Sequence, residues 1–148
     1  MCVEDHQQIE HFLTRGVEKV FPSADFVQAR LKEGKPLTMY LGIDPTGPSL
    51  HLGHIVALRK LRQFQDLGHK VILLIGDFTG MIGDPSDKSA TRQRLTRKEV
   101  LQNAKLYKTQ ASKILRFSGK NAAVLKYNSK WLAKLSFEDV VELAAHFT

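Results

Sequence analysis

The chain has 148 residues, which is enough for one domain with a hydrophobic core and too few for two ordinary domains. Its longest apolar run, residues 71–75, is far too short to span a bilayer, and the acidic N-terminus lacks an apolar signal core. The single cysteine, Cys2, excludes an internal disulfide and a multi-cysteine metal site. We therefore expect a cytoplasmic protein with no membrane partner. The net charge of +7 permits polyanion partners such as ATP or RNA, although composition alone favours a solvated basic surface.

The first half of the sequence predicts two short helices and then a parallel unit. Apolar spacing indicates helices at 9–20 and 26–31, with Pro22 between them and Ser23 as an N-cap. A strand at 37–43, a helix at 53–67 ending at Gly68, and a strand at 70–75 follow. This order predicts a right-handed βαβ unit. The second strand is almost continuously apolar, so we expect it to be buried on both faces of the sheet.

The second half continues the alternation. Residues 76–88 look like a loop, and Thr96 with Glu99 forms a capping box for a helix that runs to about residue 115. A strand at 122–127 and a helix at 137–146, capped by Ser136, complete the chain. The fold class predicted is α/β, the first half of a Rossmann-like doubly wound parallel sheet. Half a sheet leaves one edge and one face poorly covered, so we expect the chain to be a truncated piece of a longer protein.

The most informative segment is PTGPSLHLGH, residues 45–54, directly after the first predicted strand. A helix start has unpaired N–H groups and partial positive charge, which suit a phosphate. His51 and His54 stand three residues apart around Gly53, so both rings can face that phosphate while the backbone comes close. The segment predicts nucleotide chemistry at an α-phosphate. A basic cluster between Lys88 and Lys98, after a glycine-rich stretch, favours the same role.

Other motifs are less convincing. The glycines of residues 76–83 do not have the G-x-G-x-x-G spacing, and GDPSDKS at 83–89 has Asp87 where a P-loop needs glycine. His51 and His54 lack a third ligand at a known spacing, so no protein-bound metal is expected. The remaining histidines look like ordinary surface or cap residues; they are His6, His11, His69 and His146.

HLGH resembles the HIGH signature of class I aminoacyl-tRNA synthetases. Four more segments, in the right order and spacing, make the chain similar to bacterial tyrosyl-tRNA synthetases over nearly its whole length. They are YLGIDPT at 40–46, LRKLRQFQDLGH at 58–69, GDPS at 83–86 and YNSKWL at 127–132. The tryptophanyl enzymes are the nearest competitor, but their counterpart of the Asp44 turn usually lacks the aspartate.

This resemblance implies a tyrosine–tRNA ligase. The tyrosine carboxylate would attack the α-phosphate of ATP, bound as its magnesium complex, and the tyrosyl group would then pass to tRNA(Tyr). The resemblance implies catalytic roles for five residues: Thr46 and His51 at the β- and γ-phosphates, His54 at the ribose, and Lys88 and Arg92 over the pyrophosphate. It implies an ATP site with Gly42, Asp44, Pro45 and Gly53. It implies tyrosine-binding residues at Tyr40, Thr79, Asp84 and Asn128.

The resemblance also implies how the chain is divided. Residues 1–36 would form an amino-terminal helical segment, and residues 37–148 the first half of the catalytic domain. The second half with its KMSKS loop, the anticodon-binding region and the C-terminal RNA-binding region would be absent. Family members are homodimers, so we expect the same of the full-length enzyme. The chain departs from the family at Asp87, where family members usually have a glycine after the Pro85–Ser86 pair. A non-catalytic ATP- or RNA-binding fragment, and a tryptophanyl-type synthetase, stay open as alternatives.

Overall fold

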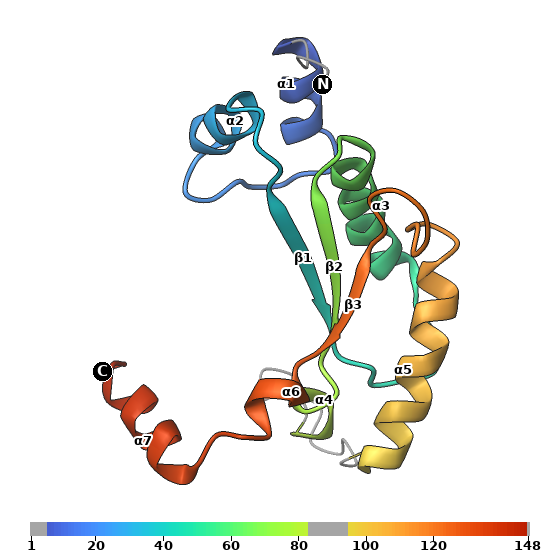
Figure 1. Ribbon diagram of the computed structural model, residues 1–148, viewed down its shortest axis with the longest axis vertical. Coiled ribbons are helices and arrows are strands. Elements are labelled where there is room, and N and C mark those ends of the chain that lie inside the picture. The colour runs from blue at the N-terminus through green and yellow to red at the C-terminus, as the bar shows by residue number, and fades with distance from the viewer. Residues whose placement is uncertain (1–5, 83–94, 148) are drawn as a thin grey trace.

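A three-stranded parallel sheet forms the centre of the molecule. The computed structural model describes residues 6–82 and 95–147. The strands β1 (Thr38–Ile43), β2 (Lys70–Ile75) and β3 (Val124–Tyr127) pair in the order β1–β2–β3. Helices α3 (Leu52–Asp66) and α5 (Arg97–Ala111) connect them and lie on the same side of the sheet (Figure 1). Two crossovers of the same hand that step in one direction across a sheet must share one face. The predicted α/β fold is confirmed.

The covered face of the sheet carries the hydrophobic core. Alternate residues of β2 point toward the helices and are almost fully buried, because side chains alternate between the two faces of a strand. The core cluster brings together Val71, Leu73 and Ile75 of β2, Leu58, Leu61 and Phe64 of α3, and Ala104, Tyr107 and Ala111 of α5. Burial of each large apolar side chain contributes about 1.5–3 kcal/mol. This packing fixes the ends of the strands, from which the candidate site is built.

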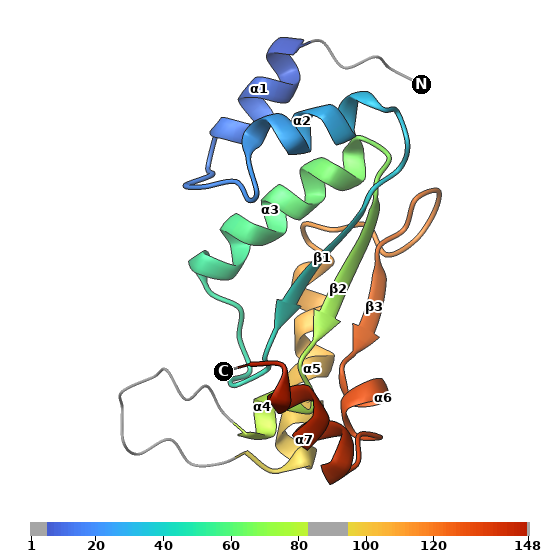
Figure 2. The same ribbon diagram turned by 90° about the vertical axis from the view of Figure 1, so that its left-hand side faces the viewer.

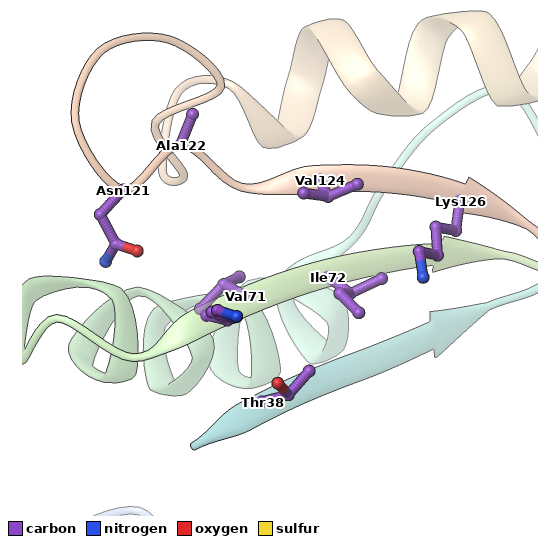
Figure 3. A pocket seen from close by; sticks show the side chains of 8 residues that line it. Thr38, Val71, Ile72, Asn121, Ala122, Val124 and Lys126 are labelled. Carbon is purple, nitrogen blue, oxygen red and sulfur yellow. The ribbon is translucent and has the colours of Figure 1, made fainter. Parts of the chain in front are cut away.

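The opposite face of the sheet is open. Ile72 and Leu74 are only half-buried there, and Tyr40 is 70% exposed. The expectation that the second strand would be buried on both faces is therefore wrong, because both crossover helices cover the other face. A shallow hollow of about 290 Å³ lies on the open face near the start of the strands (Figure 3). Its lining includes Thr38, Lys70, Ile72, Asn121, Val124 and Lys126.

Two helices, α1 (His6–Thr14) and α2 (Ala24–Lys32), lie beyond the end of the sheet at which the strands begin (Figure 2). The first ends well before residue 20, where the sequence predicted its end, since Gly16 adopts a φ of +68°. Lys60 of α3 holds this helix: its Nζ donates to the carbonyls of Phe12 at 2.8 Å and Arg15 at 2.9 Å. Burial lowers the pKa of Lys60. Ser23 caps α2 as expected, accepting from the Phe26 N–H.

Several local expectations need correction. Residues 79–82 form a short helix, α4 (Thr79–Ile82), where a loop was expected, and residues 129–132 form a further short helix, α6 (Ser129–Leu132), that was not predicted. Helix α5 ends at Ala111 rather than near residue 115, because the chain continues as a tight turn in which Ile114 N–H donates to the Ala111 carbonyl. His69 is not a surface residue. It is 7% exposed, and its Nδ1 accepts from the Leu37 N–H at 3.2 Å.

The last element, α7 (Phe137–Ala145), begins at the predicted cap, Ser136, whose hydroxyl accepts from the Asp139 N–H. It carries an apolar face that the described part of the chain leaves exposed, with Phe137 84% exposed and Leu143 58% exposed. Across residues 6–82 and 95–147, no helix combines the length and apolarity needed to cross a membrane.

Candidate nucleotide site

The candidate site lies where the three strands end. In a parallel sheet these carboxyl ends meet along one edge, which is where ligands of α/β proteins bind. The segment that follows β1, residues 44–51, is called here the signature turn, and it leads into α3. Helix α4 follows β2 and α6 follows β3, and both lie at this same end of the sheet (Figure 1). The hollow on the open face lies near the opposite ends of the strands and is not part of this site.

Three side chains from the three strand ends form one hydrogen-bonded chain. The Thr79 hydroxyl donates to Asp44 Oδ1 at 2.6 Å, and Asn128 Nδ2 donates to Thr79 Oγ1 at 2.9 Å. Asn128 Oδ1 accepts from the Phe78 N–H at 2.9 Å. The structure thus brings together three residues that the resemblance assigned to the ATP and tyrosine sites. Both polar atoms of the buried Asn128 amide are already engaged with protein groups.

A second polar clamp at this edge was not predicted. The buried Asp77 accepts from the Ser129 N–H at 2.9 Å and from the Ser129 hydroxyl at 2.6 Å, which ties the end of β2 to the start of α6. Gly76 stands beside it, and a side chain there would collide with Asp44 Oδ1 and Thr79 Oγ1. The glycines of residues 76–83 do not have the dinucleotide-binding spacing. The requirement for glycine at 76 arises instead from contact with a carboxylate more than thirty residues away.

The two signature histidines cap the helix that they begin. His51 Nδ1 accepts from the Gly53 N–H at 3.2 Å, and His54 Nδ1 accepts from the His51 N–H at 3.2 Å. Gly53 allows this geometry because a Cβ there would lie only 3.0 Å from His51 Cε1. Since each Nδ1 is an acceptor, each neutral ring carries its proton on Nε2. The pair therefore offers N–H donors at the start of α3, in addition to its backbone.

The environment of His54 favours its neutral form. Its ring centroid lies 3.9 Å from that of His51 and 6.2 Å from that of the buried Tyr107. Burial is the larger cause that lowers the pKa of His54 below 6.5, and the neighbouring His51 lowers it further. A neutral ring can donate a hydrogen bond to a ribose or phosphate oxygen without carrying a charge of its own.

Four other predicted residues lie in the signature turn or in the strand before it. Pro45 is buried against Gly80 of α4, and Thr46 is exposed, with its N–H donating to the Asp44 carbonyl at 2.8 Å. Gly42 and Tyr40 belong to β1 and lie on the open face of the sheet. Tyr40 precedes Asp44 by four residues, a distance of about 13 Å along an extended strand. It is therefore separate from the hydrogen-bonded chain of Asp44.

Three predicted residues, Asp84, Lys88 and Arg92, lie outside the described residues. Among the residues that are described, no three His, Cys, Asp or Glu side chains are grouped so that they could hold a metal ion. The described site thus consists of backbone and side-chain donors around the signature turn, with the Asp44 carboxylate beside them.

The sheet, its two crossovers and the turn at the strand ends define a nucleotide-binding type of α/β fold. The sequence model of the family "tRNA synthetases class I (W and Y)" matches residues 32–148, and the chain belongs to this family.

Individual relatives of this chain are consistent with this family. A protein of Moorella thermoacetica named "Tyrosine--tRNA ligase" is 53% identical in an alignment of 140 residues, which covers 92% of this chain and 33% of that protein. A protein of the same name from Carboxydothermus hydrogenoformans is 49% identical in an alignment of 151 residues, which covers 100% of this chain and 36% of that protein. A solved C-terminally truncated mitochondrial tyrosyl-tRNA synthetase of Coccidioides posadasii has a TM-score of 0.69 at 27% identity, covering 93% of this chain and 40% of that one. The chain spans about a third of the length of the curated relatives it matches.

Proposed function

We propose that this chain is the amino-terminal part of the catalytic domain of a tyrosine–tRNA ligase. The observation that carries the proposal is the meeting of the signature turn with the Asp44–Thr79–Asn128 chain at the carboxyl edge of the sheet. The names of relatives about 50% identical favour the tyrosyl over the tryptophanyl alternative. The division into a helical segment at 1–36 and half of a catalytic domain at 37–148 is part of this proposal.

In the proposed reaction, a carboxylate oxygen of tyrosine attacks the α-phosphorus of ATP. A new P–O bond forms, the bond to the bridging oxygen breaks, and pyrophosphate leaves with that electron pair. Catalysis rests on position and on donors aimed at the charge that develops on the phosphates. ATP would bind as its magnesium complex. The tyrosyl group would then pass from the adenylate to tRNA(Tyr).

The roles of individual residues follow from the resemblance and the geometry together. Thr46 and His51 would donate to the β- and γ-phosphates, and His54 Nε2 to the ribose. Gly42, Pro45 and Gly53 would let the nucleotide approach the backbone. Asp44 would face the adenylate.

For the tyrosine substrate, Tyr40 would reach the phenol and Thr79 and Asn128 would border the pocket. Asp84 would bind the ammonium group, and Lys88 and Arg92 would close over the pyrophosphate. We further propose that the full-length enzyme is a cytoplasmic homodimer.

The test is tyrosine-dependent exchange of pyrophosphate into ATP, measured on the purified chain with His51→Ala as the matched variant. Exchange that tyrosine supports, that tryptophan does not, and that falls about 10²–10³-fold in the variant supports the proposal. ATP binding without exchange would favour the non-catalytic alternative for this chain alone. A chain that neither binds ATP nor catalyses exchange contradicts the proposal.

A further inference from the structure

Polar side chains along one face of α5 form hydrogen bonds with the backbone of the signature turn. Asn103, Tyr107 and Gln110 follow one another at spacings of four and three residues, so they lie along one face of the helix. Tyr107 belongs to the buried stripe that packs against the sheet, with Ala104 and Ala111, and the half-buried Asn103 and Gln110 border that stripe. Because the turn lies beside this face, polar atoms on α5 can reach its main chain.

Four backbone groups of the turn bind to these three side chains. Asn103 Nδ2 donates to the Pro45 carbonyl at 3.1 Å. Burial raises the pKa of the Tyr107 hydroxyl, and a hydrogen bond with the Gly47 backbone opposes that rise. Gln110 uses both ends of its amide: Nε2 donates to the Pro48 carbonyl at 2.9 Å, and Oε1 accepts from the Leu50 N–H at 2.8 Å.

These contacts alternate with the residues proposed to meet the triphosphate. Thr46 is exposed and lies between the anchored Pro45 and Gly47, and the exposed His51 directly follows the anchored Leu50. The Tyr107 ring also lies edge-on to the His54 ring, with centroids 6.2 Å apart. An unanchored turn would have to be ordered when the ligand binds, at a cost in free energy. Helix α5 removes that cost in advance.

We propose that Asn103, Tyr107 and Gln110 are positioning residues. They hold Thr46 and His51 in the positions from which these two residues would contact the phosphates of the nucleotide. This inference rests on the proposed function for its ligand. It does not need any of the three side chains to touch substrate. The structural part concerns the turn itself and can be tested without ATP.

The first experiment compares Gln110→Leu with Gln102→Leu. Both changes remove an amide from α5 and keep its approximate volume, but Gln102 is exposed on the solvent side of the helix. Amide hydrogen exchange is followed in the ligand-free chain. We expect the Leu50 amide to exchange at least tenfold faster in Gln110→Leu and at the wild-type rate in Gln102→Leu. Gln110→Glu keeps an acceptor for the Leu50 N–H and should restore most of the protection. Unchanged exchange at Leu50 in Gln110→Leu would overturn the inference.

The second readout is pyrophosphate exchange. Displacement of reacting groups by about 1 Å can cost on the order of 10²-fold. We expect Gln110→Leu and Tyr107→Phe to lower kcat by 10- to 100-fold while KM for tyrosine changes less than about threefold, with Gln102→Leu unaffected. A turn that loosens without any loss of kcat would show that its anchoring does not serve catalysis. If the wild-type chain neither binds ATP nor exchanges, the proposed function fails, and the anchoring is judged by the amide exchange alone.

Discussion

Two imidazole rings begin α3, and each accepts a backbone hydrogen bond through Nδ1. The helix start was expected to present unpaired N–H groups to a phosphate. The Gly53 N–H differs from this expectation, because it already donates to His51 Nδ1. The histidines therefore complete the cap themselves. A phosphate would meet their Nε2–H groups as well as the remaining backbone of the first turn.

The titration of His54 tests this arrangement. Burial and the nearby His51 lower its pKa in the folded chain below 6.5, so between the two pKa values the unfolded chain binds more protons. The free energy of unfolding from this group therefore rises with pH through that window and levels off above 6.5. We expect the His54 ring protons, followed by NMR, to titrate below 6.5. In His51→Ala the midpoint should move upward. A wild-type midpoint at or above 6.5 would contradict the geometry.

The position of Gly76 has no room for a side chain. A methyl group there would meet the Asp44 carboxylate and the Thr79 hydroxyl, which are hydrogen-bonded to each other. We expect Gly76→Ala to lower the free energy of unfolding by about 1–3 kcal/mol, the usual cost of overpacking. The control is Gly42→Ala in β1, where a Cβ would have nothing within 4 Å. Chemical denaturation of both variants measures the difference, and equal stability would show that the strand ends move apart freely.

At the scale of elements, α3 is joined to the connection between α5 and β3 by the buried Gln65. Its Nε2 donates to the carbonyls of Arg116 at 2.8 Å and Asn121 at 3.0 Å, and its Oε1 accepts from the Arg116 N–H at 3.0 Å. Asn121, which adopts a φ of 60°, returns a bond from Nδ2 to the Gln65 carbonyl at 2.8 Å. One side chain thus satisfies three backbone groups of a loop that leads into β3.

Removal of the Gln65 amide should be costly. In Gln65→Leu the Arg116 N–H and the Asn121 carbonyl lose their partner, whereas the Arg116 carbonyl keeps the Ala123 N–H at 2.7 Å. Each unsatisfied buried group costs about 1–3 kcal/mol. We expect a loss of at least about 2 kcal/mol in the free energy of unfolding. Gln63→Leu on the exposed side of the same helix should change stability by less than about 0.5 kcal/mol. Urea denaturation monitored by circular dichroism compares the two. Similar losses in both variants would mean that the network carries no net stability.

Long elements could be predicted from the sequence, and β2 occupies the predicted residues 70–75 because Lys70 and Gly76 bracket a continuous apolar run. The four-residue helices α4 and α6 could not be predicted. The free energy gained within one helical turn does not offset the cost of nucleating it, so such short helices depend on tertiary contacts such as the hydrogen bond from the Ser129 hydroxyl to Asp77. Periodicity also cannot tell whether a second face of a sheet is covered. In the site, motif resemblance indicated Asp44, Thr79 and Asn128, but contacts that join residues fifty or more positions apart, such as Gln110 to Leu50, leave no local pattern.

At the scale of the whole molecule, the candidate site and the exposed apolar surfaces are neighbours, because α7 lies at the same end of the sheet as α4 and α6 (Figure 2). The candidate site gathers at the carboxyl edge of the sheet, while the open face and α7 present apolar side chains such as Tyr40 and Phe137 to solvent. Exposed apolar patches of this kind mark surfaces for contact with other protein. Tyr40 lies on that open face, so the proposed tyrosine pocket would extend from the strand ends along it.

A site for tyrosyl-adenylate on this chain should distinguish tyrosine from tryptophan. Calorimetry of the purified chain with two non-hydrolysable sulfamoyl analogues, one of tyrosyl-adenylate and one of tryptophanyl-adenylate, measures this preference. We expect the tyrosyl analogue to bind at least about tenfold more tightly, corresponding to about 1.4 kcal/mol, and His51→Ala to weaken this binding. Equal affinity for the two analogues, or no binding of either, would contradict this expectation.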